Sequence, residues 1–176
     1  IPDNIVPSTE VDPKLILVYL PFEEQEDIRN LLLPFPDYRF AVYAGTRSQT
    51  PEQDQHITWH PFSKSSFFND LTASSGVLCN AGFELPSEAL FLGKKLLVKP
   101  LQKQFEQLAN ALAVNQLNLG TAMPSLDYKM LNVWLHSSPV SPQNYPDVSE
   151  HISNWILDGR WDSTDQLVNE CWRQVA

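Results

Sequence analysis

Basic residues are scarce in this chain of 176 residues, which has 12 Lys and Arg against 21 Asp and Glu and a formal net charge of −9. They are scattered along the chain, so they form no cationic surface on which counterion release could drive nucleic-acid binding. We therefore expect no nucleic-acid partner. The negative charge also opposes adhesion to anionic lipid, so membrane contact is expected only through another part of a parent protein.

Long apolar runs and export signals are missing as well. No apolar stretch approaches the roughly 20 residues that span a bilayer, and the start, Ile1-Pro2-Asp3-Asn4, has no basic region or signal core. Cysteine occurs only twice, as Cys79 in an apolar run and Cys171 in an amphipathic pattern, which favours buried free thiols over a disulfide. These features predict a soluble, cytoplasmic protein, and the lack of an initiator Met indicates a fragment.

Several catalytic and metal signatures are also absent. There is no G-x-S-x-G elbow and no Walker-type glycine-rich loop, which argues against hydrolases of that type and against nucleoside triphosphatases. The histidines His56, His60, His136 and His151 lack metal-ligand spacing to one another and to the cysteines, so no metal site is expected. The sequence identifies no catalytic residue.

Apolar composition and alternating patterns predict a compact α/β domain. The chain is 43% hydrophobic, with five Trp and nine Phe, which supports one core. Residues 1–13 hold three prolines and are expected to form a linker, and residues 14–176 one domain. Short apolar runs alternate with helical patterns, which predicts a Rossmann-like parallel sheet with helices on both faces. The predicted strands are 15–20, 38–45, 57–60, 77–79, 96–98 and a short edge strand at 117–120, with a polar loop at 45–55.

The segment from Val77 to Ala111 contains the candidate site, because polar residues occur there only at the turns that follow strands. In open α/β sheets ligands bind at the carboxyl ends of strands, where helix N-termini present N–H groups to anions. Gly82 lacks a Cβ, so its backbone could take a positive φ and approach a phosphate. Glu88 lies about one helical turn further on, with a carboxylate that could accept sugar hydroxyls. The segment therefore predicts a nucleotide-sugar site.

At these residues the chain resembles the C-terminal, donor-binding domain of GT-B glycosyltransferases, especially UDP-glycosyltransferases and the N-acetylglucosaminyl transferase of peptidoglycan synthesis. The resemblance implies that the Gly82 turn faces the pyrophosphate and that Glu88 holds the ribose hydroxyls. It also implies sugar contacts after Pro100, and Trp59-His60-Pro61 resembles a Trp-x-Pro loop that packs against uracil. The implied donor-binding residues are Trp59, His60, Asn80, Gly82, Phe83, Glu88, Glu106, Gln107 and Asn110.

Two departures from the GT-B pattern qualify the implied chemistry. Many retaining GT-B enzymes have a second Glu eight residues before the ribose Glu, and Asn80 at that position favours an inverting enzyme. The loop after the first strand holds Glu23 and Glu24 where relatives have Gly and Ser, which weakens any phosphate grip there. The resemblance implies the donor half of a hexosyltransferase that uses a UDP-sugar, without a metal or other cofactor. It also implies an N-terminal acceptor domain as partner, without which the fragment would be inactive.

Other interpretations of the same residues remain open. Gly82 could be only a turn residue, Glu88 an exposed helix carboxylate, and Trp59 a core aromatic. Gln107 and Asn110 could lie on a solvated helix face. At the level of function, the alternatives are half of a nucleotide-sugar 2-epimerase, which shares the GT-B architecture, and an α/β interaction or sensor domain that binds no nucleotide.

Overall fold

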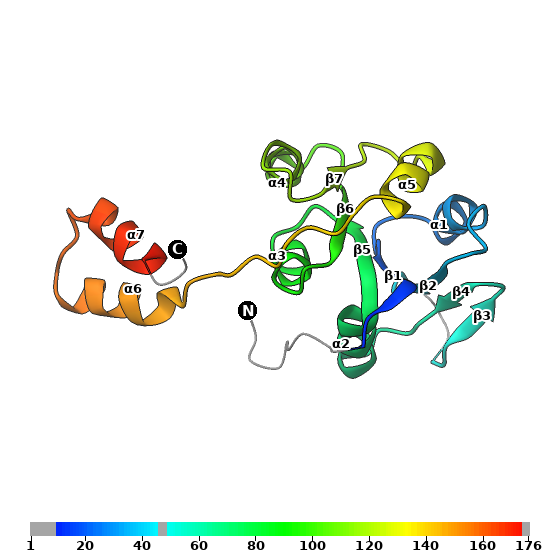
Figure 1. Cartoon of the computed structure of the whole chain (residues 1–176), viewed down its shortest axis with the longest axis horizontal. Helices are drawn as coiled ribbons and strands as arrows, with labels where there is room; N and C mark the ends of the chain where they lie inside the picture. The colour runs from blue at the N-terminus through cyan, green and yellow to red at the C-terminus, as the bar shows by residue number, and fades with distance from the viewer. Residues whose placement is uncertain (1–9, 46–48, 174–176) are drawn as a thin grey trace. The chain divides into compact units, whose positions relative to one another are not determined.

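The computed structural model describes residues 10–45 and 49–173, and the chain divides into two compact units, Ile1–Pro142 and Gln143–Ala176 (Figure 1). Most of the predicted linker, residues 1–9, lies outside the described residues. Its last part does not continue as a linker, because strand β1 already begins at Asp12. The sequence analysis expected residues 14–176 to form one domain, and the structure places the division inside that range.

A seven-stranded sheet forms the centre of the first unit, in the order β3-β4-β2-β1-β5-β6-β7. Every neighbouring pair is parallel except β3 and β4. The predicted Rossmann-like α/β fold is therefore confirmed. The strands are β1 (Asp12–Tyr19), β2 (Arg39–Val42), β3 (Glu52–Asp54), β4 (Ile57–Trp59), β5 (Ser74–Asn80), β6 (Lys95–Lys99) and β7 (Thr121–Ala122).

Two segments of the sheet differ from the prediction. The predicted polar loop contains β3, which pairs with β4 in an antiparallel hairpin whose turn places Gln55 at a φ of 57°. Backbone hydrogen bonds alone can hold a strand at the edge of a sheet, so such a strand needs no alternation of apolar and polar residues. The sequence pattern therefore gave no sign of β3. The predicted edge strand at 117–120 is wrong in position, because β7 forms at Thr121–Ala122 and residues 117–120 turn the chain toward it.

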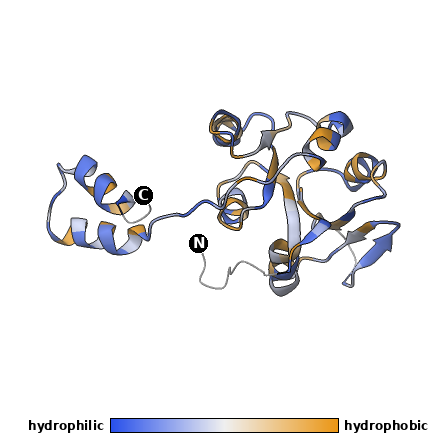
Figure 2. Ribbon diagram, in the orientation of Figure 1, coloured by the Kyte–Doolittle hydropathy of each residue, from blue (hydrophilic) through white to orange (hydrophobic). Residues whose placement is uncertain are grey.

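Helices cover both faces of the sheet. The helices of the first unit are α1 (Gln25–Leu32), α2 (Lys64–Ala73), α3 (Glu84–Phe91), α4 (Phe105–Gln116) and α5 (Tyr128–Leu135). Helices α1 and α5 share one apolar cluster with the sheet, and α2, α3 and α4 share the other. Figure 2 shows that the helices carry both apolar and polar residues, as expected for helices with one side on a sheet.

Alternate residues of the central strands feed these two clusters. In β1, Ile16 and Val18 pack with α1 and α5, whereas Leu17 packs with α2, α3 and α4. All three are fully buried. Successive side chains of a strand point to opposite faces, so a strand covered on both faces must be apolar throughout. This requirement explains the continuous apolar runs of the sequence.

The connections create a topological switch point between β1 and β5. These strands are neighbours in the sheet, yet α1, which follows β1, covers one face and α3, which follows β5, covers the other. The chain therefore diverges at the carboxyl ends of β1 and β5. Open α/β sheets form their ligand crevice at such a point.

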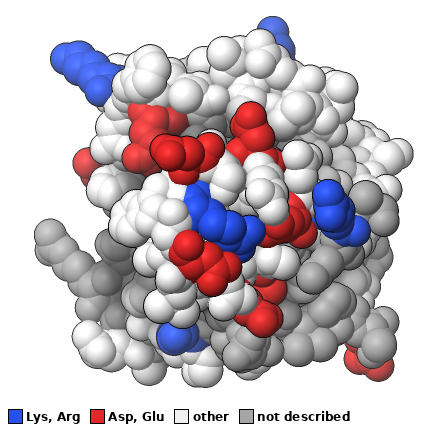
Figure 3. Space-filling model, turned by 90° about the vertical axis from the view of Figure 1, so that its left-hand side faces the viewer, with Lys and Arg blue, Asp and Glu red and all other residues white. Residues whose placement is uncertain are grey.

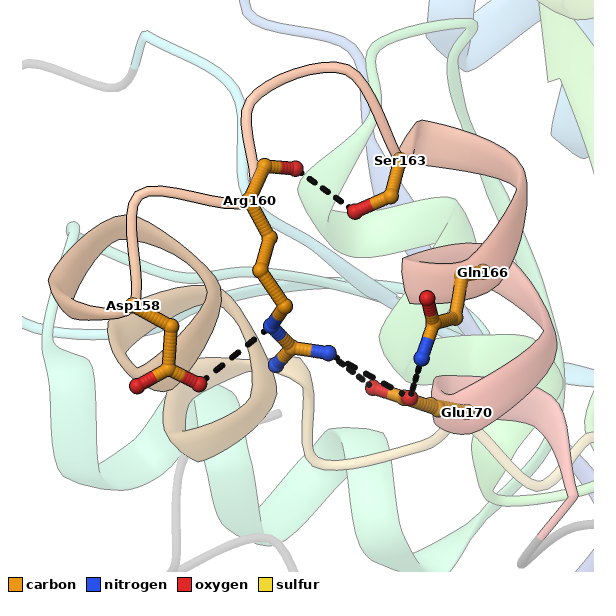
Figure 4. A network of polar contacts seen from close by, with 5 residues as sticks. All are labelled: Asp158, Arg160, Ser163, Gln166 and Glu170. Carbon is orange, nitrogen blue, oxygen red and sulfur yellow. Dashed lines mark hydrogen bonds and ion pairs between the residues drawn. The ribbon is translucent and has the colours of Figure 1, made fainter.

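The second unit consists of α6 (Val148–Leu157) and α7 (Thr164–Trp172). Arg160 links the helices, since its guanidinium lies 3.2 Å from Asp158 Oδ2 and 3.4 Å from Glu170 (Figure 4). Gln166 also donates a hydrogen bond to Glu170 at 2.7 Å, and this contact, with the charge of Arg160, lowers the pKa of Glu170. Ser163 precedes α7 but donates to the Arg160 carbonyl and makes no capping hydrogen bond.

Three general properties complete the description. Cys79 and Cys171 are both free and buried, as predicted from their apolar settings. Within the described residues, no helix has the length and apolar character needed to cross a bilayer. Figure 3 shows a face of the molecule on which acidic side chains gather around basic ones, which fits the net charge of −9.

Candidate functional site

The turn after β5 is anchored by two neighbouring elements. The Asn80 side-chain amide donates to the Lys99 carbonyl at 3.0 Å, and the Ala81 N–H donates to the same carbonyl at 3.3 Å. From the other side, the Asn110 amide of α4 donates to the Ala81 carbonyl at 3.0 Å. Asn80 Oδ1 is buried and has no hydrogen-bond partner among the described residues. The turn is therefore held in place from β6 and from α4.

Gly82 lies at the open tip of this turn. A Cβ built on Gly82 would meet no atom within 4 Å, so the space above the backbone is unfilled. The positive φ considered for Gly82 is not adopted, because among the described glycines only Gly93 and Gly159 have one. The reason for a glycine at this position is therefore not backbone conformation. Open space above its backbone leaves room for the close approach of a ligand.

Helix α3 begins two residues after Gly82, so its N-terminus lies next to this turn in the chain. Its N-cap residue, Phe83, is 73% exposed, and the Phe83 side chain makes no capping hydrogen bond. The first N–H groups of a helix lack partners within the helix and attract anions. Glu84 in the first turn is the acidic residue closest to this end. Uncapped N–H groups beside an open turn form an arrangement that suits phosphate oxygens.

Glu88 lies one turn further along α3 and is half-buried. Burial raises the pKa of its carboxyl group, and the nearby charge of Glu84 raises it further. A partly desolvated carboxylate gains more from a hydrogen-bond donor than an exposed one does. Glu88 is therefore a carboxylate that would gain from a hydrogen-bond donor.

Helix α4 carries the three residues predicted to contact a sugar, and they have different environments. Glu106 is exposed. Gln107 is 9% exposed, and its side-chain oxygen accepts a hydrogen bond from the Leu101 N–H at 3.0 Å. Asn110 holds the Ala81 carbonyl, as described above. The two amides thus fix the backbones of the two loops that follow β5 and β6.

The predicted base-contacting residues point to opposite faces of the sheet. Trp59, at the end of β4, is 3% exposed and packs in the cluster of α1 and α5. His60 stacks on Tyr43 with ring centroids 4.8 Å apart and lies 3.7 Å from Asp70. Tyr43 donates to Asp70 at 2.6 Å, and burial together with this hydrogen bond raises the pKa of Tyr43. His60 and Phe62 help to line a small aromatic cavity of about 170 Å³.

A crevice of about 440 Å³ lies between α1 and α5, beside the carboxyl ends of β1 and β6. None of the predicted site residues lines it. Lys99 was missed, although a lysine that ends the apolar run of β6 is a recognisable signal of a buried charge at a strand end. The lining residues are Glu23, Asp27, Asn30, Leu31, Lys99, Gln102, Pro124, Ser125, Leu126 and Tyr128.

Comparison with known proteins identifies the family. A family model described as glycosyl transferase family 1 matches residues 2–139. The chain belongs to this family. The predicted resemblance to GT-B glycosyltransferases is thereby confirmed at the level of the family, and the particular subfamily remains a prediction. Among curated proteins, none matches this glycosyl transferase family 1 chain.

Solved structures share the fold of this glycosyl transferase family 1 chain. The glycotransferase of kitacinnamycin has a TM-score of 0.55 and 18% identity, with 73% of this chain and 35% of that chain covered. The glycosyltransferase SnogD from Streptomyces nogalater has a TM-score of 0.50 and 16% identity, with 70% of this chain and 33% of that chain covered. ALG13, solved by NMR, has a TM-score of 0.54 and 11% identity, with 76% of this chain and 89% of that chain covered. The chain thus spans about a third of the first two enzymes and most of ALG13.

Proposed function

We propose that this chain binds the nucleotide-sugar donor of an inverting hexosyltransferase, with a UDP-sugar as the preferred donor. The observation that carries the proposal is the open Gly82 turn, which is anchored on both sides and followed by the uncapped N-terminus of α3. In this proposal the diphosphate lies against the turn and the helix N-terminus. The membership of the glycosyl transferase family supports it.

The remaining donor contacts follow from the positions of the predicted residues. Glu88 would accept the ribose hydroxyls, and Glu106, the exposed member of the α4 set, would reach the sugar. Gln107 and Asn110 would act by holding the loop backbones, since their amides are already engaged. The base would contact the loop after β4 through His60 and its aromatic cavity, because the Trp59 ring is buried.

In the proposed chemistry this chain stabilises the negative charge of the leaving group. As the glycosidic bond breaks, negative charge develops on the leaving diphosphate, and N–H groups at the start of α3 would stabilise it. This scheme needs no metal ion. Asn80 takes the place at which retaining relatives have a carboxylate, and an amide is a poor nucleophile. Turnover would require an acceptor-binding domain and a catalytic base outside this chain.

Titration calorimetry of the chain with UDP, GDP and ADP tests this proposal. We expect UDP to bind most tightly, and Glu88→Ala to weaken its binding by about 1 to 3 kcal/mol through the loss of a charged hydrogen bond. Glu84→Ala is the matched control, because it removes the same charge from the first turn of the same helix and should not weaken binding. Absence of binding by all three nucleotides, or equal loss in both variants, would contradict the proposal.

A further inference from the structure

The crevice between α1 and α5 contains a buried ion pair that the predicted site does not use. Lys99, at the end of β6, is 8% exposed and contacts the carboxylate of Glu23, which follows β1. Their side chains are only 10% and 15% exposed. Among the described residues that line the crevice, Lys99 is the only basic one, and Glu23 and Asp27 are the acidic ones.

A buried ion pair of this kind contributes little net stability. Removing two charges from water costs several kcal/mol per ion, and apolar side chains of similar size often serve folding equally well. The lysines at the other end of β6 are bound differently, since Lys94 and Lys95 donate to the backbone carbonyls of Thr72 and Leu135, each at 2.7 Å. A backbone carbonyl is a fixed partner. A carboxylate on a side chain that can rotate is a partner that another anion can replace.

We propose that Lys99, whose backbone carbonyl anchors the Gly82 turn, extends the diphosphate site of that turn into this crevice, and that Glu23 pairs with Lys99 until the diphosphate replaces it. The inference rests on the proposed function and adds the cation that the Gly82 turn lacks. An ammonium group forms strong, charge-assisted hydrogen bonds with phosphate oxygens. Lys99 also accepts the Asn80 and Ala81 bonds through its carbonyl, so it is directly connected to that turn.

The position of Glu23 permits the exchange. It lies in the turn between β1 and α1 and is only partly exposed, so rotation of its side chain moves the carboxylate toward solvent without a change of the backbone fold. While Glu23 remains beside Lys99, an incoming diphosphate meets two carboxylates, Glu23 and Asp27, and a neutralised lysine. Glu23 should therefore oppose binding, whereas Lys99 should favour it.

Four single variants test these opposite roles by calorimetry with UDP and with inorganic pyrophosphate. Lys99→Met should weaken binding of both at least about tenfold, and Glu23→Gln should strengthen it about three- to tenfold. The controls are Lys103→Met on the same loop and Glu24→Gln, the neighbour of Glu23; both residues are exposed. Each control removes the same charge outside the crevice, so each should change the affinity less than about twofold.

A double variant protects the test against misfolding. Lys99→Met alone leaves Glu23 buried and unpaired, whereas Glu23→Gln with Lys99→Met leaves no charge in the pair. The double variant should fold and bind as weakly as Lys99→Met. Normal binding by both Lys99 variants, or weaker binding by Glu23→Gln, would overturn the inference while the Glu88 result still supports the donor site. If the wild type binds neither UDP nor pyrophosphate, both proposals fail.

Discussion

Glycine and buried lysine occur at both ends of the strands, here called the amino edge and the carboxyl edge of the sheet, but in opposite settings. Toward the amino edge, Gly76 of β5 lies against Trp134 so closely that a Cβ would meet the ring at 2.9 Å, and Lys95 donates to a backbone carbonyl. At the carboxyl edge, Gly82 faces open space and Lys99 contacts a carboxylate in a crevice. The difference teaches that glycine and buried lysine indicate a ligand site only where their surroundings leave room for one.

The largest effect is expected from Gly82→Val. The new side chain would occupy the space assigned to the diphosphate, so nucleotide affinity should fall at least about 100-fold, or about 3 kcal/mol. Stability should change by less than about 0.5 kcal/mol, because no atom lies within 4 Å of the built Cβ and the backbone needs no positive φ. Calorimetry and urea denaturation measure the two quantities. If Gly82→Val bound nucleotide as tightly as the wild type, the open space at Gly82 would not be a ligand site.

Gly76→Val should have the reverse outcome. A Cβ there would lie 2.9 Å from the Trp134 ring and 3.3 Å from Ile16, so the free energy of unfolding should fall by about 1 to 3 kcal/mol through overpacking. The protein that remains folded should bind nucleotide normally. The urea midpoint checks the first statement. A midpoint equal to that of Gly82→Val would show that the amino edge is as open as the carboxyl edge.

Lys94 supplies a pH test of the amino edge. Burial lowers the pKa of Lys94 from its usual 10.5 to about 8, so between these values the unfolded chain binds more protons than the folded one. The free energy of unfolding should therefore rise with pH across this window, by up to about 3 kcal/mol from this group. Lys94→Met should remove this contribution and leave that of Lys95, whose pKa burial also lowers, whereas exposed Lys103→Met should retain both. Denaturation at several pH values would contradict the assignment if both variants behaved alike.

The smallest effect is expected from Asn110→Ala. It removes the hydrogen bond to the Ala81 carbonyl, so stability should fall by about 0.5 to 1.5 kcal/mol, and nucleotide affinity a few-fold as the Gly82 turn loosens. Glu106→Ala on the same helix is the control for stability, because its side chain is exposed. Equal denaturation midpoints for the two variants would show that Asn110 does not anchor the turn.

Much of the fold could be predicted from patterns of residues that are close together in the sequence. The apolar run of β1 predicts a strand buried on both faces, and Gly82 followed by Pro86 predicts a turn into α3. Strand β3 was not predictable in this way, because its residues are polar and its pairing depends on the backbone of β4. The divergence of Trp59 and His60 could have been anticipated, since adjacent strand residues point to opposite faces.

The candidate site was predicted less completely than the fold, because its decisive contacts join distant segments. Glu23 and Lys99 meet only when the carboxyl ends of β1 and β6 are brought to one edge. The engagement of Gln107 and Asn110 with loop backbones also depends on the docking of α4. Sequence spacing indicates that amides are present, but only the packing decides whether they face a ligand or the chain itself.

The most direct test is to record the backbone amide spectrum of the ¹⁵N-labelled chain by NMR during titration with UDP. If the carboxyl edge binds the donor, the shifted amides should concentrate in residues 80–88, in residues 99–110, in the loop after Trp59 and around Glu23. The amides around Gly76, Lys94 and Lys95 should remain in place. Shifts concentrated at that amino edge or in α6 and α7, or a spectrum unchanged by saturating UDP, would contradict the account.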